Sequence, residues 1–287
     1  LPSEAYDFLA GAIAGGAQCD LEETSILRIL ASVQSVGGSP IELFVGLLSQ
    51  RFLHGTGDLL GAMIRDARLE IRFEQPVVEV VQGEDVVEVR TETGEFYRAA
   101  ACVLATPAST VQDIAFQPDL PGDRSAYLTG PSRVHGVKKL LIVENVPAGL
   151  FCIGGISARY QWLWEERALT GGRTLLCAFG MHKDTNSNDL ELAQSAVAQF
   201  VPEARVVGVD GENWFDDPYS RGVLRYGRPG YGHTLGQKIS APHGRVLFAG
   251  TEFTDKPLFW GWIEGAIDRG HVAAHEAAAL LGSAGAQ

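Results

Sequence analysis

The sequence contains no long apolar run and no excess of basic residues. No segment approaches the roughly 20 consecutive apolar residues that a membrane-spanning helix needs. Acidic residues outnumber basic ones, 35 to 23, which gives a formal net charge of -12 at pH 7. Nucleic acids and anionic membrane surfaces attract basic proteins, so this charge argues against both as partners. It does not favour an anionic substrate either.

Cysteine is also scarce, with four residues in 287 and no CxxC spacing. Three of the four lie in apolar runs, as reduced core cysteines do, and we expect no metal site. The first residues, LPSE, lack the basic start and apolar core of a signal peptide, although a leader removed upstream would leave no trace. These features favour a reducing, cytoplasmic setting.

The length of 287 residues allows a large core and two lobes. Apolar residues three and four apart predict helices in residues 1–50, with a break at 37–40. Residues 54–61, HGTGDLLG, come near a dinucleotide-binding fingerprint, but the glycine spacing is GxGxxxG and no strand precedes it. We interpret these glycines as a turn that starts a helix.

Alternating apolar residues predict a meander of strands that begins at residue 69. Its strands are expected at 69–73, 77–81, 86–91 and 96–98, followed by a continuous apolar strand at 101–105. A second lobe is expected from residue 132 onward. It should contain a strand at 136–147, a helix at 189–200 and a strand at 205–209.

The stretch 246–280 organises the rest of the chain. Residues 246–249 form a short apolar run that suits a buried strand, and helical spacing fills 261–280. Gly250 ends the strand, where a bulky side chain would block a ligand, and Glu264 suits the positive end of the helix dipole. A strand that feeds a helix start through a glycine-flanked loop can hold an anion. A plain strand–helix unit that closes a sheet has the same spacing.

The letters FAGTE and GWIEGA in this stretch closely resemble the C-terminal FAD-binding signature of the flavin-containing amine oxidase family. That family includes monoamine oxidases, polyamine oxidases and L-amino-acid oxidases. The resemblance assigns the ribityl and pyrophosphate contacts of FAD to Gly250, Thr251 and Glu252. It also implies that backbone N–H groups at the helix start, at Gly261, Trp262 and Ile263, stabilise the negative charge of the reduced flavin.

The resemblance covers nearly the whole chain, but only the later part of the family's fold. It implies an α/β class with an α+β insert. Residues 1–50 and 128–222 would form the substrate domain, and 51–127 and 223–287 would form segments of the FAD-binding domain. The pattern PVVEV…VVEVRTETGEFYRAAACVLATP resembles the family's second FAD segment, which implies an adenine contact by the backbone of Val77.

Two lysines begin the strand at 136–147. A lysine at the mouth of a buried strand usually extends to solvent. In the family, one lysine of this strand hydrogen-bonds a water at flavin N5, and counting back from Pro147 gives Lys139. Lys138 points to the other face, and a boundary slip of one residue would give it the role instead. Residues 212–222, ENWFDDPYSRG, resemble a second family pattern, which implies that Trp214 packs beside the flavin.

Two departures from the family concern the cofactor and the substrate. Val223 stands where animal monoamine oxidases bond a cysteine to the flavin, so we expect FAD to be non-covalent. Leu224 and Trp262 stand where monoamine oxidases present two tyrosines to the substrate. One aromatic wall survives, which weakens the case for a simple arylalkyl monoamine.

The family's first βαβ unit, with its GxGxxG turn, is missing from the sequence. GAIAGG, at residues 11–16, lies inside a helical pattern and has the wrong spacing. Half of the FAD site must therefore come from elsewhere, from a second chain, from a processed precursor, or from a longer protein of which this is a fragment. We expect a hetero-oligomeric or processed oxidase.

The expected function is FAD-dependent oxidation of an amine C–N bond to an imine. One alternative is a subunit of an L-amino-acid oxidase or monooxygenase, because GWIEGA or close variants occur there too. A second alternative is a non-catalytic subunit that stabilises a flavoprotein partner. The presence of Lys139 and Trp214 argues against the loss of catalytic function that this second alternative requires.

Overall fold

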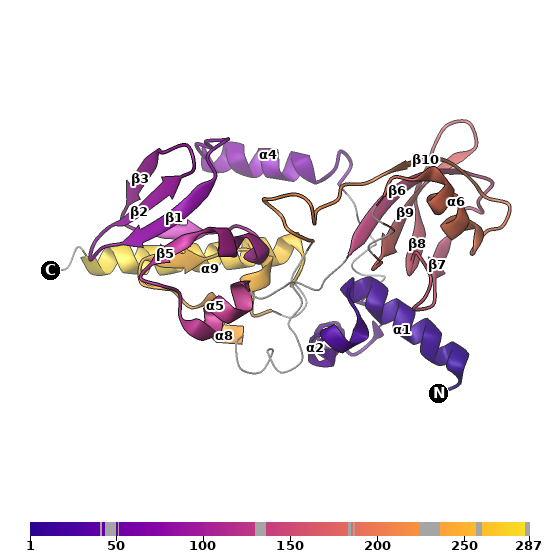
Figure 1. Ribbon diagram of the computed structural model, residues 1–287, viewed down its shortest axis with the longest axis horizontal. Helices are drawn as coiled ribbons and strands as arrows, with labels where there is room; N and C mark the ends of the chain where they lie inside the picture. Colours follow the sequence, from indigo (N-terminus) through magenta and orange to yellow (C-terminus); the bar gives the residue numbers. More distant parts are fainter. Residues whose placement is uncertain are drawn as a thin grey trace. The chain divides into compact units, whose positions relative to one another are not determined.

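The computed structural model describes residues 1–40, 42–43, 50, 52–129, 136–182, 185, 187–223, 236–256 and 260–284. The chain divides into two compact units, whose elements are labelled in Figure 1. Unit 1 comprises Leu1–Ser25, Pro107–Val111 and Leu128–Thr234. Unit 2 comprises Ile26–Thr106, Gln112–Tyr127 and Leu235–Gln287.

Unit 1 is built on an antiparallel sheet with the strand order β10-β6-β9-β8-β7. The strands are β6 (Val137–Glu144), β7 (Phe151–Ile153), β8 (Trp162–Ala168), β9 (Arg173–Gly180) and β10 (Arg205–Asp210). Helix α6 (Leu190–Ala198) precedes β10 and begins at a strong N-cap. Asp189 there accepts hydrogen bonds from the backbone N–H groups of Glu191 and Leu192, which satisfies two donors that a helix start leaves open.

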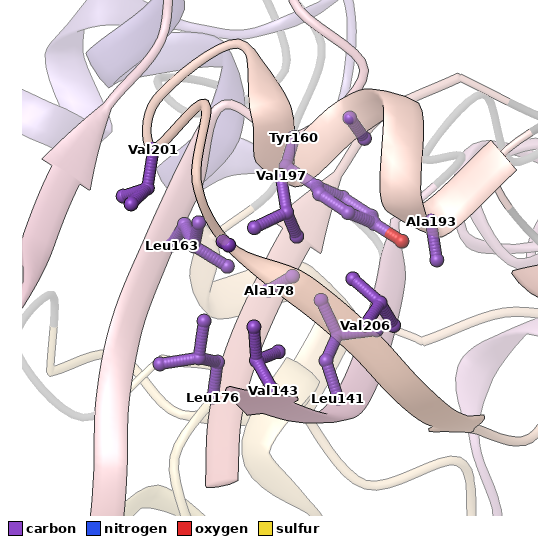
Figure 2. Packing of buried hydrophobic residues seen from close by; sticks show 12 residues of the cluster. Leu141, Val143, Tyr160, Leu163, Leu176, Ala178, Ala193, Val197, Val201 and Val206 are labelled. Atoms are coloured by element: carbon purple, nitrogen blue, oxygen red, sulfur yellow. The ribbon is translucent and has the colours of Figure 1, made fainter. Parts of the chain in front are cut away.

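Helix α6 covers one face of this sheet, and the two form the core of unit 1 (Figure 2). The sheet contributes large aliphatic side chains such as Leu141, Leu163 and Leu176, all fully buried. The helix contributes small ones, Ala193 and Ala196, which let it approach the strands closely. Each buried leucine stabilises the fold by about 1.5–3 kcal/mol relative to an exposed one.

Helix α1 (Ser3–Ala17) packs on the same unit through glycine, and is followed by the short helix η1 (Leu21–Glu23). A Cβ atom at Gly11 would lie 2.0 Å from the carbonyl oxygen of Gly154, and one at Gly15 would lie 2.5 Å from the Trp162 ring. The Trp162 indole N–H donates to the Ala12 carbonyl at 3.0 Å. The glycines of GAIAGG therefore serve close helix–sheet packing.

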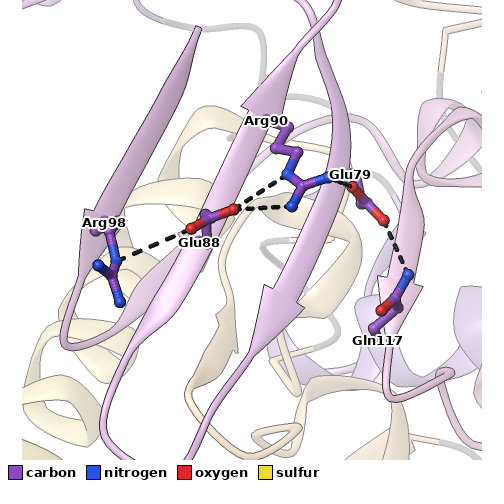
Figure 3. A network of polar contacts seen from close by, with 5 residues as sticks. All are labelled: Glu79, Glu88, Arg90, Arg98 and Gln117. Atoms are coloured by element: carbon purple, nitrogen blue, oxygen red, sulfur yellow. Dashed lines mark hydrogen bonds and ion pairs between the residues drawn. The ribbon is translucent and has the colours of Figure 1, made fainter. Parts of the chain in front are cut away.

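Unit 2 contains the predicted meander, with strand order β3-β2-β1-β5. The strands are β1 (Val77–Gln82), β2 (Val87–Thr91), β3 (Phe96–Ala99) and β5 (Ala115–Gln117). A network of polar side chains crosses all four strands of this sheet (Figure 3). Arg90 bridges Glu79 and Glu88 at 3.1 and 3.0 Å, and Gln117 donates to Glu79 at 2.9 Å. Each such cross-strand pair stabilises the sheet by a small energy, and together the pairs help to fix the register of the strands.

A parallel pair of strands, β4 (Cys102–Leu104) and β11 (Val246–Phe248), forms the second sheet of unit 2. Helix α9 (Ile263–Ala284) packs on β11 and on the short helix η4 (Thr251–Phe253). The other helices are α2 (Ile26–Ser35), α4 (Thr56–Ala67), η2 (Ala108–Asp113), α5 (Gly122–Thr129) and α8 (Gly236–Ser240).

The α/β class predicted from the sequence is confirmed, and so are most of the predicted elements. The strand predicted at 69–73 is wrong: the described residues show none there. Its apolar side chains, Leu69, Ile71 and Phe73, are exposed, because no neighbouring strand pairs with them in the described part of the chain. The chain passes from one unit to the other after residues 25, 106, 111, 127 and 234. The sequence predicted domain limits after residues 50, 127 and 222. The assignment of the segments to substrate and FAD domains stays a prediction.

No disulfide joins the four cysteines, which lie as separate thiols. Among the described residues, no helix is both long and apolar enough to cross a lipid bilayer. In the same part of the chain, no three His, Cys, Asp or Glu side chains gather as metal ligands would.

Candidate active site

The two lysines at the start of β6 point to opposite faces of the sheet of unit 1. Burial alternates along the strand: Val137, Lys139 and Leu141 are buried, whereas Lys138 is exposed. The side chain of Lys139 is 0% exposed. The strand period of two thus places one lysine in the interior and the other in solvent.

Two neutral oxygen atoms are among the partners of the Lys139 ammonium. Its Nζ donates to Oδ1 of Asn188 at 2.9 Å and to the carbonyl oxygen of Gly211 at 3.1 Å. Asn188 directly precedes the N-cap of α6, and Gly211 directly follows β10, which pairs with β6. A Cβ atom at Gly211 would lie 2.7 Å from Cδ of Lys139, so only glycine lets this turn approach the lysine so closely.

Burial lowers the pKa of Lys139 from its ordinary value, because the charged form loses its hydration. The carboxylates of Asp210 and Glu212 oppose that shift. Both are exposed, and solvent therefore screens them. The result is a lysine that gives up its proton more readily than an exposed lysine does.

Trp214 lies three residues beyond Gly211, in a loop that its own backbone bonds fix. Its carbonyl accepts from the N–H of Gly222 at 2.8 Å, and Ser109 Oγ donates to the Ser220 carbonyl at 2.6 Å. The Trp214 side chain remains 43% exposed. Lys139 and Trp214 thus come from one strand and one adjoining loop, both within unit 1. Val223, at the end of the loop, packs against Ala17 and Cys19.

The predicted FAD segment of unit 2 is a strand, a glycine turn and a helix. Gly250 follows β11 with φ of 113°, which favours glycine, and Thr251 and Glu252 form η4 after it. Gly261, with φ of 83°, precedes the start of α9. Trp262 and Ile263 there are 39% and 40% exposed. The first N–H groups of a helix have no acceptor within it, so this start offers donors beside an apolar surface.

Arg269 fixes the position of α9, although nothing in the sequence pattern singled it out. Its Nε donates to the Phe248 carbonyl at 2.7 Å, and its Nη2 donates to the Ser240 carbonyl at 2.7 Å. Glu276, seven residues later on the same helix, accepts a hydrogen bond from the same Nη2 at 2.9 Å. Arg269 therefore joins the helix to the end of β11 and to α8. A buried arginine inside a helical repeat looks like a surface residue, which is why the pattern did not reveal it.

The remaining predicted site residues are placed as follows. Val77 is the first residue of β1 and pairs with Thr91, in the four-stranded sheet of unit 2. Leu224 lies outside the described residues. The structure also reveals two residues that no sequence pattern indicated. Asn188 contacts Lys139, and Arg269 anchors α9.

The donor set of unit 2 fits a flavin. A flavin presents an apolar ring system whose carbonyl end gains negative charge on reduction, and the start of α9 combines N–H donors with the exposed Trp262 and Ile263. The turn at Gly250 carries no side chain that would shield the backbone from a ligand.

Comparison with known proteins assigns the chain to a class. A family model described as flavin containing amine oxidoreductase matches residues 3–278. The chain therefore belongs to the flavin-containing amine oxidoreductases, and its cofactor is FAD. The resemblance drawn from FAGTE and GWIEGA is thereby confirmed.

Individual relatives are similar along most of the chain. It is 31% identical to (S)-6-hydroxynicotine oxidase of Paenarthrobacter nicotinovorans over 77% of its length and 51% of that protein. It is 28% identical to nicotine dehydrogenase of Pseudomonas putida over 80% of its length and 48% of that protein. The chain thus spans about half the length of the curated relatives it matches.

A solved structure shares the fold. Cyclohexylamine oxidase from Brevibacterium oxydans superposes with a TM-score of 0.75 at 19% identity, covering 98% of this chain and 65% of that one.

Proposed function

We propose that this chain is the lysine-bearing part of an FAD-dependent oxidase that converts an amine C–N bond to an imine. The observation that carries the proposal is Lys139, the most deeply buried charged side chain that the structure describes. Charges are costly to bury, so a fully buried lysine at the start of a strand suggests a chemical task rather than a structural one. The family membership and the amine substrates in the relatives' names support the same reading.

The chemistry that FAD supplies when bound is acceptance of a hydride equivalent from the carbon that bears nitrogen. The imine then takes up water to give a carbonyl compound and an amine or ammonia. An acceptor such as oxygen takes the electrons, with hydrogen peroxide as the product from oxygen.

The residues of this chain would bind FAD, orient it and tune its chemistry. In unit 1, Lys139 would hold a proton and a hydrogen-bonded water for the flavin, and Trp214 would offer it an apolar surface. In unit 2, Trp262 would offer an apolar surface of its own. Gly250, Thr251 and Glu252 would hold the ribityl side of FAD. The backbone from Gly261 to Ile263 would favour negative charge on the flavin ring. The backbone of Val77 would contact the adenine. Because Val223 and its neighbours offer no nucleophile, FAD is held without a covalent bond.

The pyrophosphate half of the site comes from a segment that this sequence does not contain. A pyrophosphate needs the glycine turn and helix start of a βαβ unit. We propose that a second chain, or another part of a processed precursor, supplies GxGxxG. If a second chain supplies it, the oxidase is a hetero-oligomer.

An amine screen on the complete, flavin-loaded protein tests the function. Cyclic amines, arylalkyl amines, polyamines and L-amino acids are supplied with oxygen, and peroxide is measured. The proposal expects peroxide with at least one amine class and loss of the signal with Lys139→Met. Peroxide with L-amino acids alone would favour the amino-acid oxidase reading, and a colourless complex without turnover would favour a structural subunit.

A further inference from the structure

We propose that the outward face of helix α1 is a docking surface for the segment of the oxidase that this chain does not contain. Tyr6, Leu9 and Ile13 lie along this face, three and four residues apart. Residues with that spacing share one side of a helix. The inference rests on the proposed two-part oxidase, and it places a contact of the missing segment in unit 1, the unit that contains Lys139.

Helix α1 is inverted compared with an ordinary surface helix. The residues that it buries are small, namely Ala10, Gly11, Ala14, Gly15 and Ala17. Its large apolar side chains lie outside: Tyr6 is 59% exposed, Phe8 49% and Leu9 44%. A surface helix normally turns its large apolar side chains toward the core and its charged ones toward water. A helix that is apolar on both sides belongs in an interior, so the outward face of α1 needs a cover.

The rotation of α1 about its own axis is fixed by contacts on its inner side. Asp7, the only charged residue between residues 5 and 17, accepts a hydrogen bond from the N–H of Ile156 at 3.1 Å. The Trp162 indole donates to the Ala12 carbonyl at 3.0 Å. A Cβ atom at Gly11 would lie 2.0 Å from a backbone carbonyl oxygen. A larger side chain therefore has no room on the inner side, and α1 cannot turn its large apolar side chains toward the sheet.

The charges of α1 favour a protein segment over a lipid surface as the cover. Helices that lie on membranes carry Lys and Arg on their polar face, and α1 contains neither. Acidic residues flank the apolar face at both ends, Glu4 before it and Asp20, Glu22 and Glu23 after it. An anionic lipid surface would repel them.

The size of the face favours a segment of the same oxidase over a second copy of this chain. Helix α1 has 15 residues. A helix of that length extends about 22 Å, and one face of it covers roughly 200 Å². A stable dimer buries about 800 Å² on each partner. The relatives carry about as much chain again as the part that this chain matches. A segment of that remainder needs no large area of its own, because the rest of the oxidase fold already holds it.

Photo-crosslinking from position 9 of the complete, flavin-loaded oxidase tests this surface. Leu9 is replaced by p-benzoylphenylalanine, and mass spectrometry identifies the peptide to which it bonds on illumination. We expect a peptide from outside this sequence of 287 residues. Leu190, the first residue of α6, is the matched control, because it is a leucine of the same unit and 46% exposed. Single exposed apolar residues are normal on a surface, so p-benzoylphenylalanine at position 190 should capture no such peptide.

A charge at position 9 gives a second measurement. Leu9→Glu would bury a carboxylate beneath the docked segment, and we expect the urea midpoint of the complete oxidase to fall by about 1 M. Leu9→Met keeps the apolar volume and should keep the midpoint. Leu190→Glu, the control, should leave the midpoint almost unchanged. If Leu9→Glu fails to fold, the crosslink at position 9 decides.

Crosslinks from position 9 to this sequence alone would overturn the proposal, because they would show a second copy or the chain itself as the cover. The absence of any crosslink would overturn it too, as would equal midpoints for Leu9→Glu and Leu190→Glu. Failure of the proposed function looks different. In that case position 9 still captures the outside peptide, but no amine reduces the flavin.

Discussion

At the scale of the residue, the molecule turns on a lysine that is buried beside neutral oxygen atoms. Removing an ammonium from water costs several kcal/mol unless it is paired, and the Lys139 contacts with Asn188 and Gly211 offset part of that cost. Proteins retain such groups where a shifted proton affinity serves chemistry. The exposed Lys138, one residue earlier, supplies an internal control for every experiment on Lys139.

Lys139→Met tests the role of the ammonium in turnover. Methionine keeps the volume of the side chain but removes the donor, so we expect flavin to be retained and turnover, or the reaction with oxygen, to fall roughly 10²-fold. Stopped-flow absorbance of the flavin measures both half-reactions. Lys138→Met should behave as the wild type, and the reverse pattern would move the role to Lys138.

The lowered pKa of Lys139 also predicts how stability depends on pH. Between its folded-state pKa and 10.5, the unfolded chain binds more protons than the folded one, so Lys139 makes stability rise with pH in that window. Below the folded-state pKa its burial penalty is fully present, and above 10.5 the penalty has gone. Cys19 and Tyr160, whose burial raises their pKa values to about 11 and about 12, act in the opposite sense.

The comparison of wild type with Lys139→Met cancels those other groups. We expect the wild type to gain stability relative to the variant as the pH rises from 8 toward 10.5, measured by urea unfolding at each pH. A stability difference that stays constant over this range would contradict the lowered pKa.

At the scale of the element, the start of α9 is fixed by a bond that lies further along the helix. Arg269 reaches the carbonyl of Phe248 at the end of β11 and the carbonyl of Ser240 at the end of α8. The helix start, with Trp262 and Ile263, is therefore held against the glycine turn by an anchor two turns away. Precise placement of a cofactor contact depends on such supporting residues.

Arg269→Met removes this anchor and leaves two buried carbonyl oxygens without their donor. We expect the free energy of unfolding to fall by about 2–4 kcal/mol, and FAD retention to weaken with it. Arg65→Gln, on the exposed helix α4, is the matched control and should change stability by no more than about 0.5 kcal/mol. Equal small effects from both substitutions would show that α9 is held by its apolar contacts alone.

Local patterns predicted most elements because helices and strands have their own periods. The alternation of β6 predicted that Lys138 and Lys139 face opposite ways, and the structure buries Lys139. The same alternation at 69–73 predicted a strand wrongly, because a strand also needs a neighbour to pair with. Asn188 lies 49 residues from Lys139, and a hydrogen bond across that distance leaves no trace in a local pattern. Because Asn188 directly precedes the N-cap Asp189, the sequence pattern indicates only an ordinary helix boundary there.

At the scale of the whole molecule, the chain spans about half of its relatives' length. In the proposed function it would provide the flavin and lysine side of an oxidase. Among the described residues, the parallel sheet β4–β11 has two strands, whereas parallel sheets are normally wider and covered on both faces. Val103 on β4 is exposed, as a strand at an open sheet would be. These features fit a partner segment that extends this sheet.

The isolated chain is expected not to bind FAD, because it lacks the turn that holds the pyrophosphate. Co-purification followed by mass spectrometry should recover a polypeptide carrying GxGxxG, with a buried interface on the order of 2,000 Å² or more. A stable monomer of this chain that binds FAD stoichiometrically would contradict the two-part site.

Anaerobic titration of the flavin decides whether this chain takes part in flavin-dependent amine oxidation. The complete, flavin-loaded protein is mixed with an amine that the peroxide screen has selected, and the flavin band near ~450 nm is followed. We expect one equivalent of amine to bleach the band, oxygen to restore it, and Lys139→Met to slow one of these two steps. A flavin band that no amine bleaches would show that the proposed function is wrong.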